Sequence, residues 1–296
     1  MKILICSDGH RQAEKAIRFI ANTAADCAAE VTLLGVIEHP SDEPALLGAL
    51  RKQASILRDK QVSVEVVTRS GQPLEEIQKR NAATPFDLVV FGAEHKNGGR
   101  FAMSAKVYHL IKSIAAPVLV LIGERTELRR ILICSGGQAY IDNAVKLTGQ
   151  LACHLHLAVA ILHVLAQPPA MFAGLLASEQ NVEELLGSST ALGRNLRSEK
   201  EALAAFGITP EFKLRHGLVV PEILDELKQG DYDLVVTGSA LSAGAMRTYI
   251  MGDVTSEIVN RAECAVLVVR SDGAARRGFF QSIVRLFSKP QDSGQG

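Results

Sequence analysis

Four apolar segments of the first half of the chain recur in the second half in the same order. Residues 3–7, which read Ile-Leu-Ile-Cys-Ser, return as residues 131–135, and the Asp-Leu-Val-Val segment before Gly92 returns before Gly238. Four ordered matches indicate a tandem duplication, and the second copy is longer because it carries an insertion between residues 166 and 209. The two other matches pair residues 31–36 with 159–164 and residues 117–121 with 265–269.

The two copies, repeat one and repeat two, alternate short apolar runs with amphipathic segments. Continuous apolar runs are typical of parallel strands whose two faces are both covered. With helices between them, they predict an α/β fold of two tandem three-layer sandwiches, each with a five-stranded parallel sheet. The predicted strands are residues 2–7, 31–37, 63–68, 87–91 and 117–121, then 130–134, 158–164, 211–214, 233–237 and 265–269. The predicted helices are residues 13–25, 45–60, 74–81 and 105–114, and residues 178–206 are predicted to be mostly helical with weak points at Gly187 and Gly193.

The duplication predicts two domains, residues 1–124 and 129–270, followed by a basic amphipathic tail, residues 271–296. At about 100° per residue, the apolar side chains of the tail fall on one face of a helix. We expect this face to dock on a surface, either of protein (this chain or a second copy) or of an anionic membrane. These apolar residues are Phe279, Phe280, Ile283, Val284, Leu286 and Phe287.

Composition excludes several classes of function. Lys and Arg number 32, as do Asp and Glu, and aromatic residues make up 5% of the chain with no Trp. A nucleic-acid partner is therefore not expected, because neither a basic field nor a stacking platform is present. The five cysteines form no Cys-x-x-Cys pair, so neither a disulfide framework nor a zinc site is predicted. No segment predicts a signal peptide or a membrane span, and the expected location is the cytoplasm.

Ligands of open parallel sheets bind beyond the carboxyl ends of the strands, where the strand order reverses. In each repeat this rule points to the residues that follow the first and the fourth strands. It places residues 7–9 and 135–137 at one lip of each crevice, and Gly92 and Gly238 at the other.

The order of these segments, found twice, resembles the universal stress protein family in a tandem two-domain form. The resemblance runs from Met1 to Arg270 and includes the first strand ending in Asp8, the Arg-x-Gly turns that end at Gly71 and Gly217, and the closing Val-Leu-Val strands. It implies Rossmann-like domains of the adenine nucleotide alpha hydrolase-like type. It also implies a non-catalytic binding or regulatory module of the stress response, with ATP as the expected ligand.

Nucleotide-binding members of that family hold ATP with an Asp after strand one, a Val ending strand two, and glycines followed by a Ser or Thr after strand four. Glycines let the backbone approach phosphates, and the next helix offers free N–H groups. Repeat one lacks the second glycine, where His95 stands, and repeat two has Gly136 in place of the Asp. The candidate nucleotide-binding residues are Asp8, Val36, Gly92, Val164, Gly238, Gly244, Gly252 and Thr255.

Two other functions remain open at this point. One is a slow ATPase or nucleotidyl-transfer enzyme of the same superfold, for which only Asp8 and Asp253 are candidate acidic groups in the crevice. The other is a purely structural interaction scaffold, because a glycine after a strand is often only a turn requirement. We assign no catalytic or metal-binding residue.

The last strand of each repeat is an apolar edge that needs a cover. We expect residues 117–120 and 265–268 to lie together across a pseudo-two-fold axis, so that the repeats form an intramolecular pseudo-dimer. A homodimer of the whole chain is a further expectation.

Overall fold

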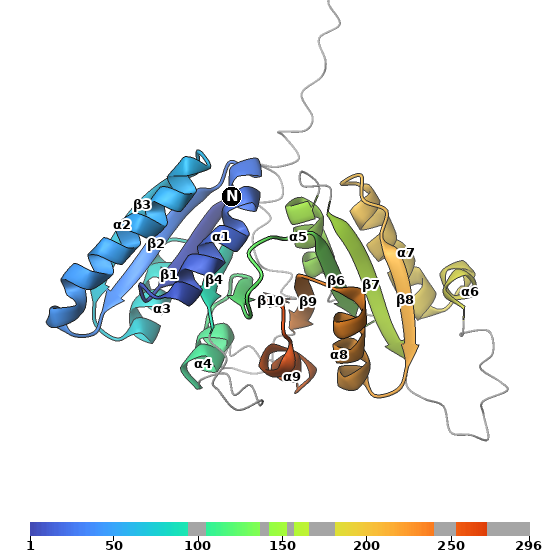
Figure 1. Ribbon diagram of the computed structural model, residues 1–296. Coiled ribbons are helices and arrows are strands. Elements are labelled where there is room, and N and C mark those ends of the chain that lie inside the picture. Colours follow the sequence, from blue (N-terminus) through green and yellow to red (C-terminus); the bar gives the residue numbers. More distant parts are fainter. Residues whose placement is uncertain (94–104, 137–141, 153–156, 166–180, 240–252, 271–296) are drawn as a thin grey trace, which may run out of the picture.

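The computed structural model describes residues 1–93, 105–136, 142–152, 157–165, 181–239 and 253–270. Their strands form one ten-stranded sheet in the order β3-β2-β1-β4-β5-β10-β9-β6-β7-β8 (Figure 1). Repeat one contributes β1 (Lys2–Ser7), α1 (Arg11–Asp26), β2 (Glu30–Ile37), the 3-10 helix η1 (Pro40–Asp42), α2 (Glu43–Asp59), β3 (Ser63–Ser70), α3 (Pro73–Ala83), β4 (Leu88–Gly92), α4 (Ala105–Ser113) and β5 (Val118–Leu121). Repeat two contributes β6 (Arg130–Ser135), α5 (Asp142–Ala152), β7 (Ala158–Leu165), α6 (Val182–Gly187), α7 (Ala191–Ala204), β8 (Glu211–His216), α8 (Val219–Gly230), β9 (Leu234–Ser239), α9 (Asp253–Arg261) and β10 (Ala265–Arg270).

All neighbouring strands within a repeat pair in parallel, as predicted. Among the strands that the structure describes, one pair is antiparallel, and it joins the repeats: β5 lies against β10 with Leu119 opposite Leu267. The expected pairing of the two last strands is therefore present in the structure. Because this pair is antiparallel, the strands of repeat one point in the opposite direction to those of repeat two. The carboxyl ends of the strands in the two repeats therefore face opposite ways.

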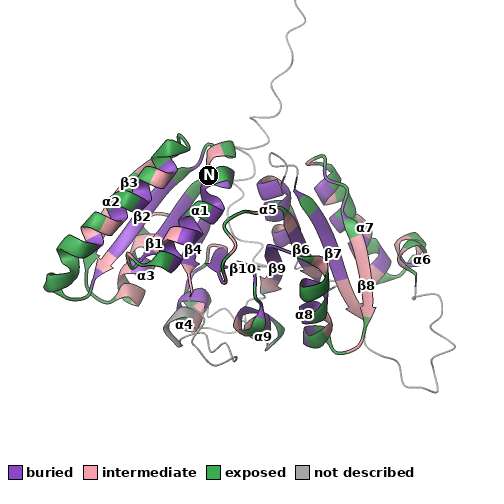
Figure 2. Cartoon of the chain, viewed as in Figure 1, coloured by how far each residue is buried: buried purple, intermediate pink, exposed green. Residues whose placement is uncertain are grey.

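Both faces of the sheet are buried, which explains the continuous apolar runs in the sequence (Figure 2). Along β1, Ile3 and Ile5 pack beneath α1 and α2, whereas Leu4 packs on the opposite face with the side chains of α3 and α4. Repeat two is built the same way, with α5 and α7 on the first face and α8 and α9 on the second.

The described part of the insertion contains two helices, α6 and α7, separated by a short break after Gly187. The side chains of Asn181 and Thr190 cap them by accepting hydrogen bonds from backbone N–H groups. The weak point at Gly187 is confirmed, because α6 ends there. Gly193 instead lies inside α7, where a Cβ atom would come within 2.3 Å of the Leu185 carbonyl oxygen. Glycine at 193 thus allows α6 to approach α7.

The predicted amphipathic tail, residues 271–296, lies outside the described residues. Among the helices that the structure describes, none combines the length and the apolar character that crossing a membrane requires.

Candidate functional site

The candidate residues of repeat one meet at the carboxyl edge of three neighbouring strands. In the sheet register Ser7 lies beside Gly35 and Cys6 beside Phe91. Asp8 directly follows β1, Val36 is the last residue but one of β2 and Gly92 ends β4, so the three lie at almost the same level. Strand order reverses between β1 and β4. The geometry therefore places these three residues where a parallel sheet binds ligands.

The turn from β1 to α1 is held by side chains. The exposed Asp8 carboxylate accepts a hydrogen bond of 2.9 Å from the His10 backbone N–H, and the Ser7 hydroxyl accepts one of 3.0 Å from Gly9. Gly9 has φ +82°, a left-handed conformation that favours glycine. This turn leads directly into the N-terminus of α1 at Arg11.

The Ser7 hydroxyl also donates a 2.6 Å hydrogen bond to the Gln53 side-chain oxygen. Gln53 lies on α2 and is 2% exposed, and its Nε2 group donates to the His10 carbonyl oxygen at 3.5 Å. One buried amide therefore ties α2 both to the end of β1 and to the turn above it.

Gly92 is required by packing. A Cβ atom at this position would lie 2.5 Å from the carbonyl oxygen of Gln12 in α1. The Gln12 side chain in turn donates from Nε2 to the Gly123 carbonyl oxygen at 3.1 Å. Close contact between β4 and α1 thus accounts for this glycine without any ligand.

Repeat two places Gly136, Val164 and Gly238 at the corresponding strand ends, because Ser135 pairs with His163 and Cys134 with Thr237. Gly136 is exposed and stands where repeat one has Asp8. His163 occupies the position of Gly35, and its Nδ1 lies 2.8 Å from the Ser135 carbonyl oxygen.

Thr255 fixes α9 to the end of β9. Thr255 is 4% exposed, and its hydroxyl donates to the Gly238 carbonyl oxygen at 3.1 Å and lies 3.1 Å from the Thr237 hydroxyl. This contact brings the first turn of α9 close to Gly238 of β9. Two further candidates, Gly244 and Gly252, lie outside the described residues.

Residues 122–129, which connect β5 to β6, are the linker, and two adjacent residues in it tie the repeats together. Glu124 pairs with Lys15 and Arg11 of α1 in repeat one. Arg125 pairs with Asp231 and Asp233 in repeat two, and these contacts raise the pKa of its guanidinium and lower the pKa of the Asp231 carboxyl.

Asp233 is the first residue of the duplicated Asp-Leu-Val-Val segment, and its role is structural. Its Oδ2 accepts hydrogen bonds from the backbone N–H groups of Arg129 (2.8 Å) and Arg130 (2.9 Å) at the start of β6. Asp87 does the same in repeat one, where its Oδ2 accepts from the Lys2 N–H at 2.7 Å. The recurring aspartate therefore holds the first strand of each repeat to the fourth.

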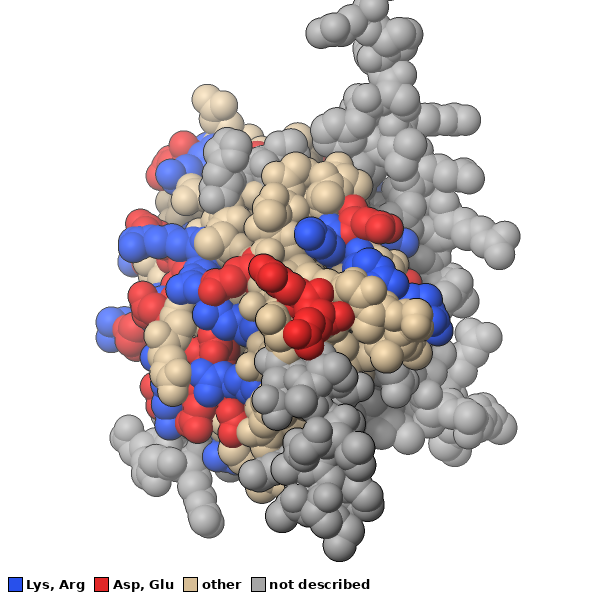
Figure 3. Space-filling view, turned by 90° about the vertical axis from the view of Figure 1, so that its right-hand side faces the viewer, with Lys and Arg blue, Asp and Glu red and all other residues tan. Residues whose placement is uncertain are grey.

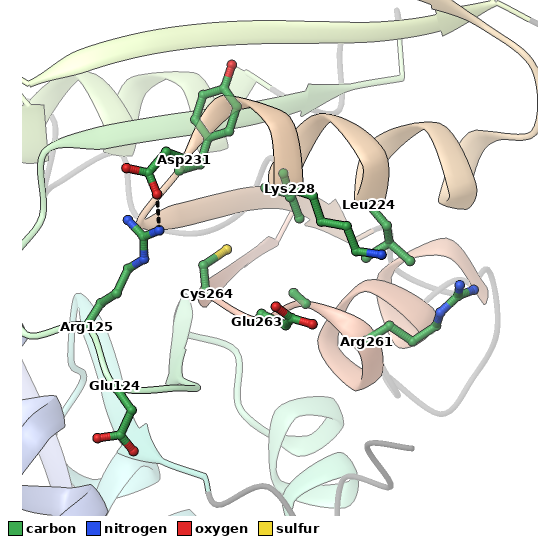
Figure 4. Close-up of a pocket in the computed structure, with 11 residues that line it drawn as sticks. Glu124, Arg125, Leu224, Lys228, Asp231, Arg261, Glu263 and Cys264 are labelled. Atoms are coloured by element: carbon green, nitrogen blue, oxygen red, sulfur yellow. Dashed lines mark hydrogen bonds and ion pairs between the residues drawn. The ribbon is translucent and has the colours of Figure 1, made fainter. Parts of the chain in front are cut away.

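A cavity of about 390 Å³ lies between the linker, α8, α9 and the start of β10 (Figure 4). Arg125 turns toward Asp231, while the Glu124 carboxylate points to the opposite side. The apolar part of its wall includes Leu224, Leu227 and Cys264. Burial raises the pKa of the Cys264 thiol to about 12, so this sulfur is protonated at neutral pH and is a poor nucleophile.

The described surface carries both signs of charge side by side, as Figure 3 shows for one face. Within the described residues no group of three or more His, Cys, Asp or Glu side chains is arranged to hold a metal ion.

Comparisons with known proteins agree with this architecture. The model of the universal stress protein family matches residues 1–121 and again residues 127–270. No curated protein matches significantly.

Three solved structures resemble the whole chain. The first is a universal stress protein from Archaeoglobus fulgidus DSM 4304, with 15% identity and a TM-score of 0.66, covering 92% of this chain and 98% of that one. The second is a functionally unknown protein from Pseudomonas aeruginosa PAO1, with 16% identity, a TM-score of 0.65 and coverage of 91% and 92%. A universal stress protein from Pseudomonas aeruginosa UCBPP-PA14, described as putative in its own structure report, has 15% identity, a TM-score of 0.64 and the same coverage.

At these identities the likeness concerns the fold. The family model, however, covers most of the chain in two consecutive matches that coincide with the duplicated halves of the sheet. The chain therefore belongs to the universal stress protein family, in its tandem form.

Proposed function

We propose that the chain is a non-catalytic stress-response module that binds adenine nucleotide, with ATP as the ligand, at the carboxyl edges of its repeats. The observation that carries the proposal is the meeting of Asp8, Val36 and Gly92 on neighbouring strand ends, where the strand order reverses. An acidic side chain beside an apolar one suits a nucleoside, and the resemblance assigns these positions to it.

Repeat two offers more groups suited to binding the phosphates of ATP than repeat one does. Thr255 holds the N-terminus of α9 beside Gly238, and a helix N-terminus favours phosphate. In this proposal Gly244 and Gly252 allow the backbone to approach the phosphates, and Val164 contacts the nucleoside. Repeat one supplies Asp8 but lacks the distal glycines.

Calorimetric titration with ATP tests this division. Replacement of Gly252 by Val should weaken binding by about tenfold or more, because a side chain there blocks the backbone approach. Asp8→Ala should weaken it by a few-fold, and the exposed Asp59→Ala at the amino edge serves as the control without effect. Equal losses in the Gly252 and Asp8 variants would contradict the ranking.

Two further outcomes decide between this proposal and the alternatives. Denaturing the purified protein and chromatographing the supernatant should release bound adenine nucleotide. No release, together with no heat of binding, would leave a structural scaffold. Formation of ADP above background during incubation with ATP would replace the non-catalytic module by an enzyme.

A further inference from the structure

Glu199 of α7 is a buried acidic side chain, and repeat one has no acidic residue at the corresponding position. Its Oε1 accepts a 2.7 Å hydrogen bond from the Ser135 hydroxyl at the end of β6. Glu199 is 2% exposed, and its Oε2 has no hydrogen-bond partner in the described part of the chain. A carboxylate in such a place loses its hydration without gaining a cation or a second donor.

Repeat one shows which chemical group fits this place. Gln53 of α2 is equally buried and receives the matching bond from Ser7, the counterpart of Ser135. Its amide oxygen accepts from the serine, while its Nε2 group donates to a backbone carbonyl oxygen. The position thus uses one acceptor and one donor. A carboxylic acid offers both, whereas a carboxylate offers acceptors only.

Among the charged groups near Glu199, Asp142 favours its neutral form. Asp142, at the start of α5, adds a negative field, and Lys146 on the same helix is exposed to solvent. On β7, His163 contacts the Ser135 carbonyl oxygen, and on α7 itself Arg197 donates to the Leu186 and Ser188 carbonyl oxygens. Burial, followed by the field of Asp142 and opposed by the Ser135 bond, raises the pKa of Glu199 to about 7.

We propose that Glu199 is a neutral acid in the folded protein, and that loss of its proton leaves an uncompensated buried charge between α7 and the end of β6, so that the protein becomes less stable as pH rises. The inference does not depend on nucleotide binding. Glu199 makes repeat two sensitive to pH at this position, whereas the amide of Gln53 does not titrate at the corresponding position of repeat one.

Proton linkage determines the direction in which stability changes with pH. The folded state keeps the Glu199 proton up to a pH of about 7, whereas the unfolded chain releases it near the ordinary glutamate pKa of 4.5. The stabilisation is therefore complete below about pH 4.5 and is lost between about 4.5 and 7. Within this window the unfolding equilibrium constant should rise by up to about tenfold per pH unit.

Urea unfolding of the full chain at several pH values between 4.5 and 8 tests this inference through two reciprocal variants. In E199Q this part of the pH dependence should disappear, because the amide keeps the acceptor and the donor at every pH. In Q53E the same dependence should appear in repeat one. The exposed E201Q on α7 is the matched control and should behave like the parent protein.

The measured quantity is the ratio of the unfolding constants of parent and variant at each pH, because this ratio cancels the pH dependence that the two proteins share. A ratio for E199Q that does not change with pH would overturn the proposal. If E199Q failed to fold, carbon NMR of labelled glutamates in the parent protein would replace it. A titration midpoint of Glu199 near 7 would support the inference, and one near 4.5 would refute it.

Discussion

At the scale of single residues, packing decides where this chain needs glycine. Gly92 lies so close to α1 that even a methyl group would meet the Gln12 carbonyl oxygen at 2.5 Å. We expect Gly92→Ala to lower the free energy of unfolding by about 1–3 kcal/mol, because β4 must move away from α1. Urea unfolding monitored by circular dichroism measures this change.

Gly48 provides the control for that substitution. It lies within α2, and a Cβ atom there would meet nothing within 4 Å. Gly48→Ala should stabilise the protein by up to about 1 kcal/mol, because alanine favours the helix. Equal effects of the two substitutions would show that the close contact at Gly92 does not exist.

The two aspartates that pair with Arg125 differ in burial, and this difference predicts their importance. Asp233 is 4% exposed and also accepts two backbone N–H groups, whereas the Asp231 side chain is 84% exposed. Asp233→Asn should cost about 2–3 kcal/mol of stability, because it weakens a buried acceptor of charged and backbone donors. Asp231→Asn should cost much less, because water screens the exposed carboxylate and its ion pair.

Thermal unfolding of both asparagine variants at one pH makes this comparison. The substitution at 231 keeps a residue that tolerates the left-handed backbone found there, with φ +51°, so it changes only the charge. A larger loss at 231 than at 233 would mean that the ion pair, rather than the anchoring of β6, holds the junction.

At the scale of elements, the sequence was sufficient to predict the strands but not the contacts that the insertion makes. Continuous apolar runs mark β1, β4 and β10 within two residues of their observed ends, because both faces of these strands are covered. The strand ends in turn predicted where the candidate residues meet. The pair of Ser135 and Glu199 could not be predicted, because it spans 64 residues where Ser7 and Gln53 span 46.

The linker contacts were equally hidden from sequence reasoning. Arg125 lies outside both repeats, so no duplicated pattern marks it. The recurrence of Asp87 as Asp233 was visible, but its spacing suggested only a strand start. Its role depends on the neighbouring strand, to whose backbone N–H groups it binds. Tertiary partners of this kind follow from the strand order, which the chain sequence does not state.

The edges of the sheet explain why the repeats join as they do. Both outer strands carry charged residues: Glu65 and Arg69 on β3, and Glu211, Lys213 and Arg215 at every second position of β8. Such edges resist pairing with another chain. The apolar strands β5 and β10 carry no such protection, and they cover each other at the centre.

At the scale of the whole molecule, a continuous sheet predicts that both repeats unfold together. Leu119 and Leu267 face each other across the junction, buried to 2% and 0% exposure, and the linker binds both sides. We therefore expect one transition in scanning calorimetry, with the calorimetric enthalpy equal to the van't Hoff enthalpy.

Two leucine substitutions test this cooperativity. Leu267→Ala removes a side chain at the junction, and Leu50→Ala removes an equally buried one on α2, within repeat one. Each should cost about 2–5 kcal/mol and lower the midpoint of the whole transition. If the repeats were independent, Leu50→Ala would split the transition in two and move only the part that belongs to repeat one. A single shifted transition in both variants would instead show that the antiparallel pair of β5 and β10 transmits the loss across the sheet.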